Sequence, residues 1–206
     1  MIEILEGSYV RLEPLSVDHV DNLAQAAGGD RSSFGLTTVP DGLEETRSFV
    51  EMALRLAQDG SQLPFAVRSL RTEEIVGSTR FLNIEYWNRE SNNANPDSVE
   101  IGHTWYSAQA QGTTVNPETK LLLLQHAFEV WNCKRVQLKT DARNERSRRA
   151  IAGIGAKFEG VLRNYQQVSG SGIVPGTARD TAMFSIIPAE WPTAKAGLRQ
   201  RLGLTD

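Results

Sequence analysis

The chain has 206 residues, of which 40% are hydrophobic and 23% charged, a balance typical of a folded globular domain and not of a disordered chain. Its formal net charge of −3 gives no overall positive field for nucleic acid or an anionic membrane, and no run approaches the roughly 18 apolar residues of a membrane span. We therefore expect a single domain over residues 1–206 that is soluble and cytoplasmic, with no nucleic-acid and no membrane partner.

Cys133 is the only cysteine, so the chain has neither an internal disulfide nor a multi-cysteine zinc site. It follows Trp131 and Asn132 at the end of an apolar helix, where a buried, inert thiol is the usual case. Residues 1–7 carry two glutamates, no basic segment and no long apolar run, so we expect no signal peptide. We also expect no metal site.

The first part of the chain predicts one strand and two helices. Alternating side chains indicate a strand over residues 9–13, and Ser16 is a favourable cap for the helix that follows. A second helix is predicted after Asp41, which forms a capping-box pattern with Glu44. Apolar residues then recur at helical spacing until Gly60 ends this helix.

Three extended segments follow. Residues 64–70 and 74–84 are predicted to form a hairpin, and residues 99–106 alternate as a third strand. The stretch 86–98 is rich in asparagine and is predicted to be a polar loop. The alternation of the third strand places Val99, Ile101, His103 and Trp105 on one face, and Glu100, Thr104 and Tyr106 on the other.

The remaining sequence alternates helices and strands without a repeat or a composition break. The helix over 116–131 is apolar nearly all round and belongs in the core. The other predicted elements are a strand over 134–140, a helix over 144–154, strands over 158–162 and 181–187 joined by a glycine-rich loop over 168–176, and a terminal helix over 188–202.

The stretch from Gln109 to Glu118 carries the strongest functional signal. The strand ends near Tyr106, a loop of small residues follows, and a helix begins at Asn116 with Pro117 in its favoured first turn. Such a loop presents free backbone N–H groups and the positive end of a helix dipole, a combination that binds phosphate or pyrophosphate. A plain strand-to-helix connection is the alternative interpretation.

Two motifs resemble the GNAT superfamily of N-acetyltransferases. Residues 111–116 (QGTTVN) resemble its pyrophosphate loop, Q/R-x-x-G-x-G/A. Residues 140–151 (TDARNERSRRAI), followed by Gly155-Ala156, resemble the strand and helix that hold the pantetheine arm. The pattern is most similar to the RimJ/RimL-like branch, the ribosomal-protein N-acetyltransferases. The resemblance extends from about Gly7 to Arg179-Asp180-Thr181 and is strongest over 99–163.

The resemblance implies an α/β (α+β) fold, a single GNAT domain with a mixed, mostly antiparallel seven-stranded sheet and helices on both faces. The sheet is expected to splay between residues 99–106 and 134–140, where acetyl-CoA enters as co-substrate. The implied reaction moves the acetyl group from acetyl-CoA to a primary amine by direct attack in a ternary complex. The acceptor is a small-molecule or peptide amine, and a homodimer is one expected assembly.

Two other functions stay open. A GNAT-fold module could bind acyl-CoA as a sensor while turning over weakly or not at all. A protein that uses the loop as a nucleotide-binding P-loop is disfavoured because no Gly-Lys-Ser/Thr follows it. The sequence does not choose among a protein N-terminus, a small-molecule amine and an aminoglycoside-like drug as acceptor.

The resemblance also assigns residues. Thr114 and Asn116 depart from the loop motif, which has glycine, or glycine or alanine, at these positions. Ile151 stands where many GNATs carry a tyrosine that protonates the leaving thiolate, and Ser147 is the candidate donor instead. The implied cofactor-binding residues are Thr104, Tyr106, Gln111, Gly112, Thr113, Thr114, Val115, Asn116, Asn144 and Ser147.

For the general base, the strand over 99–106 offers two residues on opposite faces. Glu100 is the predicted base, because a partly buried carboxylate can take the ammonium proton directly or through water. A structural ion pair is the alternative role for Glu100. His103 lies among the apolar residues of the strand and is interpreted as a core histidine.

Two further groups of residues have open roles. Arg143, Arg146, Arg148 and Arg149 form a basic run, which is either a solvated helix face or a contact for the 3′-phosphate of CoA. The aromatic residues Tyr86, Trp87 and Trp105 either border the acceptor cleft or serve packing alone.

Overall fold

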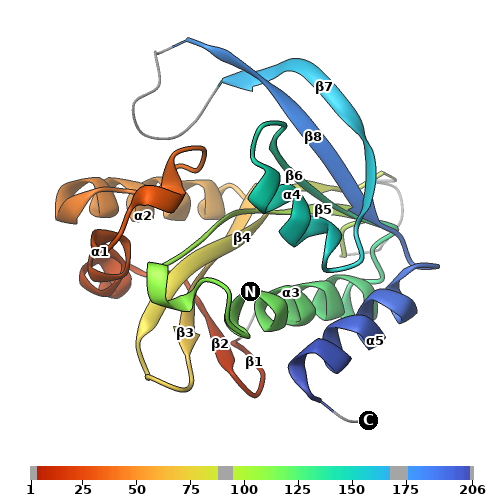
Figure 1. Cartoon of the computed structure of the whole chain (residues 1–206), viewed down its shortest axis with the longest axis horizontal. Helices are drawn as coiled ribbons and strands as arrows, with labels where there is room; N and C mark the ends of the chain where they lie inside the picture. Colours follow the sequence, from red (N-terminus) through yellow and green to blue (C-terminus); the bar gives the residue numbers. More distant parts are fainter. Residues whose placement is uncertain (1–3, 88–94, 168–175, 205–206) are drawn as a thin grey trace.

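One mixed sheet organises the fold of the computed structural model, which describes residues 4–87, 95–167 and 176–204 (Figure 1). Its strand order is β1-β2-β3-β4-β5-β6-β8-β7, with every neighbouring pair antiparallel except β5 and β6. The strands are β1 (Leu5–Glu6), β2 (Val10–Pro14), β3 (Gln62–Ser69), β4 (Ile75–Glu85), β5 (Ser98–Tyr106), β6 (Arg135–Asp141), β7 (Lys157–Gln167) and β8 (Ala178–Ile186). The predicted mixed, mostly antiparallel sheet is confirmed, with eight strands among the described residues in place of seven.

In the part of the chain that the structure describes, five α-helices cover both faces of this sheet, as predicted. They are α1 (Val20–Gly28), α2 (Gly42–Gln58), α3 (Val115–Gln125), α4 (Glu145–Ala152) and α5 (Trp191–Leu202). Helix α3 continues into a single π-helical segment, η4 (His126–Val130), and a short 3₁₀ turn, η3 (Ala108–Ala110), precedes it. None of the helices in the described residues is long and apolar enough to cross a membrane.

The first two helices begin where the sequence predicts, but with partly different caps. Ser16 caps a 3₁₀ turn, η1 (Val17–His19), that leads into α1, and its backbone N–H donates to His19 Nδ1 at 3.0 Å. Before α2, the backbone N–H of Asp41 donates to Glu45 Oε2 at 2.9 Å, so Glu45 takes the place predicted for Glu44. Both contacts satisfy an N–H group at a helix start that would otherwise lack a partner.

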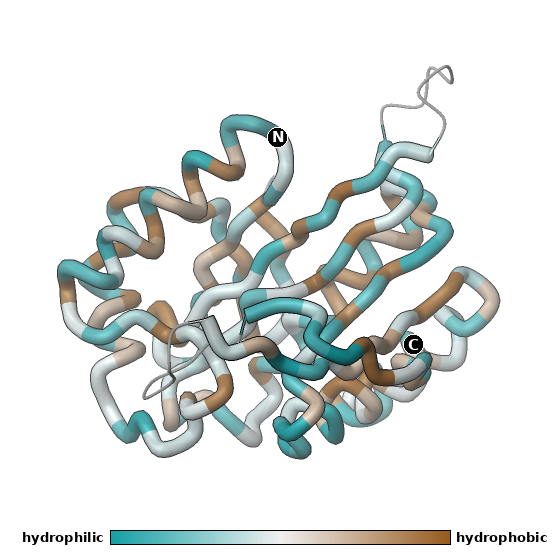
Figure 2. The backbone as a smooth tube through the Cα atoms, turned by 90° about the horizontal axis from the view of Figure 1, so that it is seen from above, coloured by the Kyte–Doolittle hydropathy of each residue, from teal (hydrophilic) through white to brown (hydrophobic). Residues whose placement is uncertain are grey.

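Two hydrophobic cores lie on opposite faces of the sheet. Residues of α3, α4 and α5 pack in one core, and residues of α1 and α2 pack in the other. Brown and teal segments alternate along helices and strands in Figure 2, as expected for elements with one buried side and one solvent-facing side. The apolar helix predicted over 116–131 lies in the core: Leu121, Leu123 and Leu124 are all buried.

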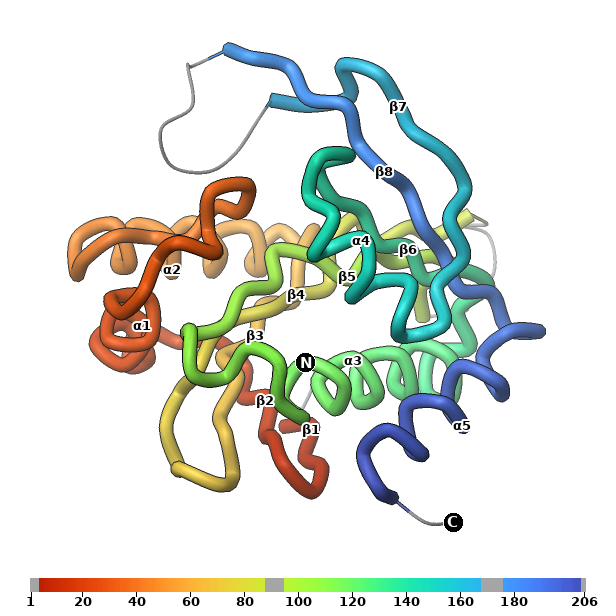
Figure 3. Tube along the Cα trace, viewed as in Figure 1, coloured from red at the N-terminus to blue at the C-terminus, as the bar shows by residue number. Residues whose placement is uncertain are grey.

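The sheet splays at its middle, as predicted. Strands β5 and β6 pair only through Ser98–Glu100 and Arg135–Gln137. Beyond these residues β5 continues beside β4, while β6 continues beside β8. Figure 3 shows the β7–β8 hairpin arching out past α4, on the β6 side of the sheet. Strand β7 extends well beyond the predicted 158–162, and residues 168–175 of the predicted loop lie outside the described residues.

A β-bulge at His103 reverses the faces of β5. His103 has φ +47°, and one residue of β4, Thr79, lies opposite two residues of β5, His103 and Thr104. Before the bulge, Ile101 packs in the core with α3; after it, Trp105 packs in the core with α2. The predicted uninterrupted alternation is therefore wrong, and Glu100 does not share a face with Thr104 and Tyr106.

Candidate active site

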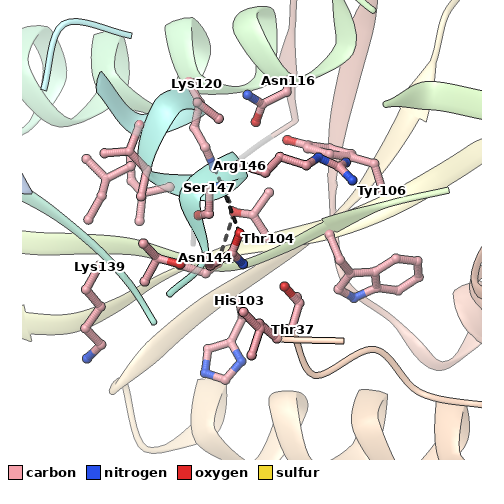
Figure 4. Close-up of a pocket in the computed structure, with 18 of the residues that line it drawn as sticks. Thr37, His103, Thr104, Tyr106, Asn116, Lys120, Lys139, Asn144, Arg146 and Ser147 are labelled. Atoms are coloured by element: carbon pink, nitrogen blue, oxygen red, sulfur yellow. Dashed lines mark hydrogen bonds between the residues drawn. The ribbon is translucent and has the colours of Figure 1, made fainter. Parts of the chain in front are cut away.

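A cavity of about 490 Å³ lies where β5 and β6 part. Its walls come from these two strands, the loop before α3, the start of α4 and the segment after α1 (Figure 4). Both predicted catalytic residues, Glu100 and Ser147, line it. The predicted cofactor-binding residues on its wall are Thr104, Tyr106, Gln111, Gly112, Thr113, Asn116, Asn144 and Ser147.

The loop before α3 offers several free backbone donors at this cavity. Within the described residues, the N–H groups of Gly112, Thr113, Thr114 and Asn116 donate to no protein acceptor, whereas that of Val115 is held by Thr113 Oγ1 at 3.3 Å. These donors surround the N-terminus of an 11-residue helix. The local geometry is that of an anion site, because unpaired amides and the helix dipole both favour negative charge.

Gly112 and Gln111 hold this loop in shape. Gly112 has φ +75°, a conformation in which a side chain is strained. Gln111 Nε2 donates to the carbonyl of Tyr106 at 2.8 Å and to Ser33 Oγ at 3.0 Å. The glutamine therefore ties the loop both to the end of β5 and to the segment between α1 and α2.

Thr114 and Val115 do not line this cavity, although the sequence assigned both to the cofactor. Val115 is buried in the core, and Thr114 occupies the N-cap position of α3. Both line a second cavity of about 660 Å³ beside the β3–β4 turn. The departure of Thr114 from the family motif therefore does not change the wall of the first cavity.

The second predicted motif supplies the opposite wall. Asn144 Oδ1 accepts a hydrogen bond from the backbone N–H of Ser147 at 3.0 Å and so caps α4, which leaves the side-chain NH₂ of Asn144 available. The buried Asp141 fixes the preceding turn, because it accepts bonds from the backbone N–H and the guanidinium of Arg143. Ser147 is half-buried, and its hydroxyl has no hydrogen-bond partner within the described residues.

Only Arg146 in the basic run lines the cavity. Its Nη2 donates to Gln111 Oε1 at 2.5 Å. Arg143 is paired with Asp141, Arg148 lies over the ring of Phe158, and Arg149 pairs with Glu145 within the helix. Arg146 is therefore the member of the run placed next to the free amides of the loop.

Glu100 is a buried ion-paired carboxylate on the cavity wall, with 2% of its surface exposed. Its Oε2 lies 2.9 Å from Lys139 Nζ and accepts a hydrogen bond from Asn83 Nδ2 at 2.7 Å. Its Oε1 accepts no hydrogen bond from the described residues. The pair therefore fixes the side chain and leaves one carboxylate oxygen without a protein donor.

His103 is exposed and lines the cavity, so its interpretation as a core histidine is wrong. The bulge turns it out of the apolar face. Partial removal of water lowers the pKa of His103 to about 4, and the positive charges of Arg80, Lys139 and Arg179 act in the same direction. The imidazole is therefore neutral near pH 7.

Lys120 is a residue of this site that the sequence did not reveal. It lies on α3 with 5% of its surface exposed, and its Nζ donates to Thr104 Oγ1 at 2.7 Å (Figure 4). Burial lowers the pKa of Lys120 to about 7. The one signal in the sequence was a lysine immediately before four leucines, in the middle of a helix expected to be buried.

The aromatic residues and the cysteine have mainly structural roles. Trp105 lines the cavity and also packs edge-on against Phe49 with ring centroids 6.3 Å apart, whereas Tyr86 and Trp87 are exposed and do not line the cavity. Cys133 is buried, and burial raises the pKa of its thiol to about 12, which keeps it protonated. In the part of the chain that the structure describes, no three His, Cys, Asp or Glu residues are grouped to hold a metal ion.

Known proteins share this architecture. A family model for the acetyltransferase (GNAT) domain matches residues 10–157. The uncharacterised N-acetyltransferase p20 of Bacillus licheniformis is 22% identical over 191 residues, which cover 92% of this chain and 99% of that protein. The structure of a GCN5-related N-acetyltransferase from Brucella melitensis has a TM-score of 0.80 at 28% identity and covers 96% of this chain and 84% of that one.

RimJ of Mycobacterium smegmatis, solved with CoA-disulfide, has the same fold, with a TM-score of 0.72 at 21% identity over 97% of this chain and 91% of that one. A RimL structure is a further fold neighbour, at 21% identity and a TM-score of 0.70. Since the family match spans more than half of the sequence, the chain belongs to the GNAT acetyltransferase family, with RimJ and RimL among its structural neighbours.

Proposed function

We propose that this protein transfers an acetyl group from acetyl-CoA to a primary amine by direct attack within a ternary complex. One observation carries the proposal: the free amides of Gly112, Thr113 and Asn116 and the gap between β5 and β6 border a single cavity. A diphosphate on the amides and a thioester in the gap would account for both features. GNAT membership and the CoA bound to RimJ support this assignment.

The cavity supplies the contacts that such a substrate needs. Arg146 and the loop amides would neutralise the diphosphate, and the side-chain NH₂ of Asn144 would hydrogen-bond the pantetheine arm. The β5 backbone from Gly102 to Tyr106 lies past the last pair with β6 and can donate to the thioester carbonyl. Positioning of both substrates then supplies much of the rate.

Two side chains would move protons in this scheme. Glu100, through its free Oε1, would accept the proton that the attacking amine loses, and Ser147 would donate a hydrogen bond to the leaving sulfur. A covalent acyl-enzyme on Cys133 has no support, because that thiol is buried away from the cavity and donates to the carbonyl of Pro96. Direct transfer is therefore the route that the residues favour.

The acceptor class is a small-molecule or peptide amine. An acetyltransferase of known structure from Salmonella typhimurium that modifies the N-terminal serine of ribosomal protein L7/L12 shares 20% identity, with a TM-score of 0.71. Peptides with a free N-terminus therefore belong in any acceptor panel. A cytoplasmic location and a homodimer form part of the same proposal, and cell fractionation and light scattering would check them.

The second candidate is an acyl-CoA sensor with little or no turnover. The pairing of Glu100 with Lys139 and Asn83 favours it, because this carboxylate has a structural role whether or not it takes up a proton. A sensor would bind acetyl-CoA through the same loop and release no CoA with any amine.

Release of CoA across an amine panel separates the two functions. The panel would hold serine-terminated peptides, aminoacyl amides, polyamines and aminoglycosides, with a reaction lacking amine as the background. The proposal predicts amine-dependent CoA release and intersecting initial-rate lines when both substrates are varied. Tight acetyl-CoA binding without amine-dependent release would favour the sensor, and parallel lines would contradict direct transfer.

A further inference from the structure

The buried lysine on α3 has no role in the scheme above. Lys120 lies in the second turn of a helix that is otherwise packed in the core, yet its Nζ reaches the cavity wall. Within residues 4–87, 95–167 and 176–204, no carboxylate lies within 4.0 Å of this Nζ. A buried ammonium without a counter-ion is costly, so a lysine at such a position calls for a functional explanation.

The hydrogen bond of Lys120 points its amine at the part of β5 that has left β6. Nζ donates to Thr104 Oγ1 at 2.7 Å, and Thr104 Oγ1 lies 2.8 Å from the fully buried Thr79 Oγ1. Thr104 thus accepts from the lysine, and its own hydroxyl proton can go to the carbonyl of Gly102 at 3.4 Å or be shared with Thr79. The relay anchors Lys120 through a single N–H and leaves its remaining hydrogens for a partner in the cavity.

The acidic groups of this cavity and of α3 do not compete for the lysine. Glu100 is paired with Lys139, and Glu118 on α3 accepts the backbone N–H groups of Ser8, Tyr9 and Val10. The phenol of Tyr106 is buried, which raises its pKa and keeps it neutral. The remaining titratable side chains on the wall are cationic or neutral: His103, Lys139, Arg146, Arg179 and Arg201.

We propose that Lys120 is the acid of the reaction, a catalytic residue whose ammonium meets the negative charge that develops on the CoA sulfur. This inference rests on the proposed function. As the amine nitrogen bonds to the acetyl carbon, the C–S bond breaks and its electron pair stays on sulfur. Lys120 Nζ gives one proton to that sulfur and becomes neutral, while Ser147 donates a hydrogen bond to the same atom. The acceptor nitrogen loses its extra proton to Glu100, and Lys120 regains one from water after CoA leaves.

This assignment explains why a lysine is present instead of a hydroxyl alone. A serine hydroxyl titrates far above neutral pH, so it can stabilise a thiolate but cannot protonate it without being resupplied. Burial lowers the pKa of Lys120 to about 7, close to the value that suits an acid working near neutrality. The loss of its proton also removes the uncompensated buried charge.

Titration of the CoA thiol in the binary complex tests the inference without turnover. The ultraviolet absorption of the thiolate would be followed against pH for CoA bound to the wild type, to Lys120→Met and to Lys134→Met. The last variant removes an exposed lysine outside the cavity and serves as the matched control. We expect bound CoA to ionise at a pH lower by about one unit or more in the wild type and the control than in Lys120→Met.

Rates provide the second readout. Lys120→Met should lower kcat roughly 100-fold with little change in the KM for acetyl-CoA, and it should remove the alkaline fall in kcat measured with a weakly basic acceptor amine. Lys120→Gln provides the same comparison if the methionine variant does not fold. Equal thiol ionisation in the wild type and the Lys120 variants would overturn the inference and leave the proposed function standing. If the thiol of bound CoA ionises at a lower pH in the wild type than in the Lys120 variants but no amine is acetylated, the role of Lys120 toward the sulfur is supported. The proposed function is then overturned instead.

Discussion

Arg146 Nη2 on α4 donates a hydrogen bond to Gln111 Oε1 at 2.5 Å, which joins the helix after β6 to the loop before α3. The two residues come from the two motifs that the sequence identified separately, and both line the cavity. The contact places a guanidinium beside backbone amides that have no protein acceptor. A diphosphate bound there would accept bonds from both motifs at once.

Reversal of the charge at Arg146 should therefore weaken CoA binding. Arg146→Glu replaces a donor with a carboxylate next to the phosphates, and we expect a loss of affinity on the order of tenfold or more, measured by calorimetry. The salt dependence of binding should also become shallower. Arg149→Glu is the matched control, because Arg149 lies on the same helix, is exposed and does not line the cavity. Equal affinities in the two variants would contradict the phosphate assignment.

Gly112→Val should abolish acetyl-CoA binding by changing the backbone of the loop. Gly112 has φ +75°, and an added Cβ would meet no atom within 4 Å, so the effect comes from backbone strain alone. Gly60→Val is the control, because Gly60 has φ +77° and equally open surroundings after α2. Each variant should lose roughly 1–2 kcal/mol of unfolding free energy in denaturant titrations. Only Gly112→Val should lose the ligand, and retained affinity would argue against the loop as diphosphate site.

The parts of the site that the sequence predicted depend on short-range chemistry. A glycine after a strand, the Pro117 of a helix first turn and the Asn144 cap each act on backbone groups within a few residues, so their spacing is visible in the chain. The arrangement of sheet and helices could be predicted from the same motifs through their family resemblance. The two-residue strand β1 is too short to leave an alternating pattern.

Other features depend on contacts between distant segments. The bulge at His103 exists because β5 must pair with β4 on one side and leave β6 on the other, and no residue pattern in the strand marks it. It reverses the alternation on which the positions of Glu100 and His103 were predicted. Lys120 was missed for a related reason: its neighbours are apolar, and only the β5 segment across the cavity gives its Nζ a partner.

Ser147→Ala tests the hydroxyl at the leaving sulfur. The side chain makes no hydrogen bond to the described residues. Its removal should therefore leave the free energy of unfolding nearly unchanged and the affinity for acetyl-CoA within about twofold of wild type. Turnover should fall by roughly tenfold or more if the hydroxyl stabilises the thiolate. Ser147→Thr keeps a hydroxyl at the same position and should restore part of the rate. Wild-type turnover in Ser147→Ala would remove this residue from the mechanism.

Glu100→Gln should depress the rate most at low pH, where the acceptor is mainly ammonium and a base is most needed. The substitution also leaves Lys139 without its carboxylate, so part of the effect could come from the lost ion pair. Lys139→Met separates the two, because it breaks the same pair and keeps the carboxylate. If both variants lose stability but only Glu100→Gln changes the shape of the pH–rate profile, Glu100 is the base. Profiles of unaltered shape in both would leave Glu100 with a structural role alone.

The stability of the ligand-free protein should rise with pH because of Lys120. Its pKa is about 7 in the folded chain, against the ordinary value of 10.5 that applies when the chain is unfolded. Between these values the unfolded chain holds a proton that the folded chain has released, so each rise in pH favours the folded state, by at most about 1.4 kcal/mol per unit. Below pH 7 both states are protonated, and the folded state bears the full cost of burying the ammonium.

Lys120→Met has no such proton. Denaturant titrations of the wild type and Lys120→Met at several pH values therefore separate the contribution of Lys120 from that of all other ionisable groups. The variant should be the more stable protein at pH 7, and the difference should shrink steadily toward pH 10 as the wild type gains stability. A difference that stays constant over this range would mean that Lys120 keeps its proton in the folded chain. The amine would then act as a fixed cation, unable to deliver a proton to the sulfur.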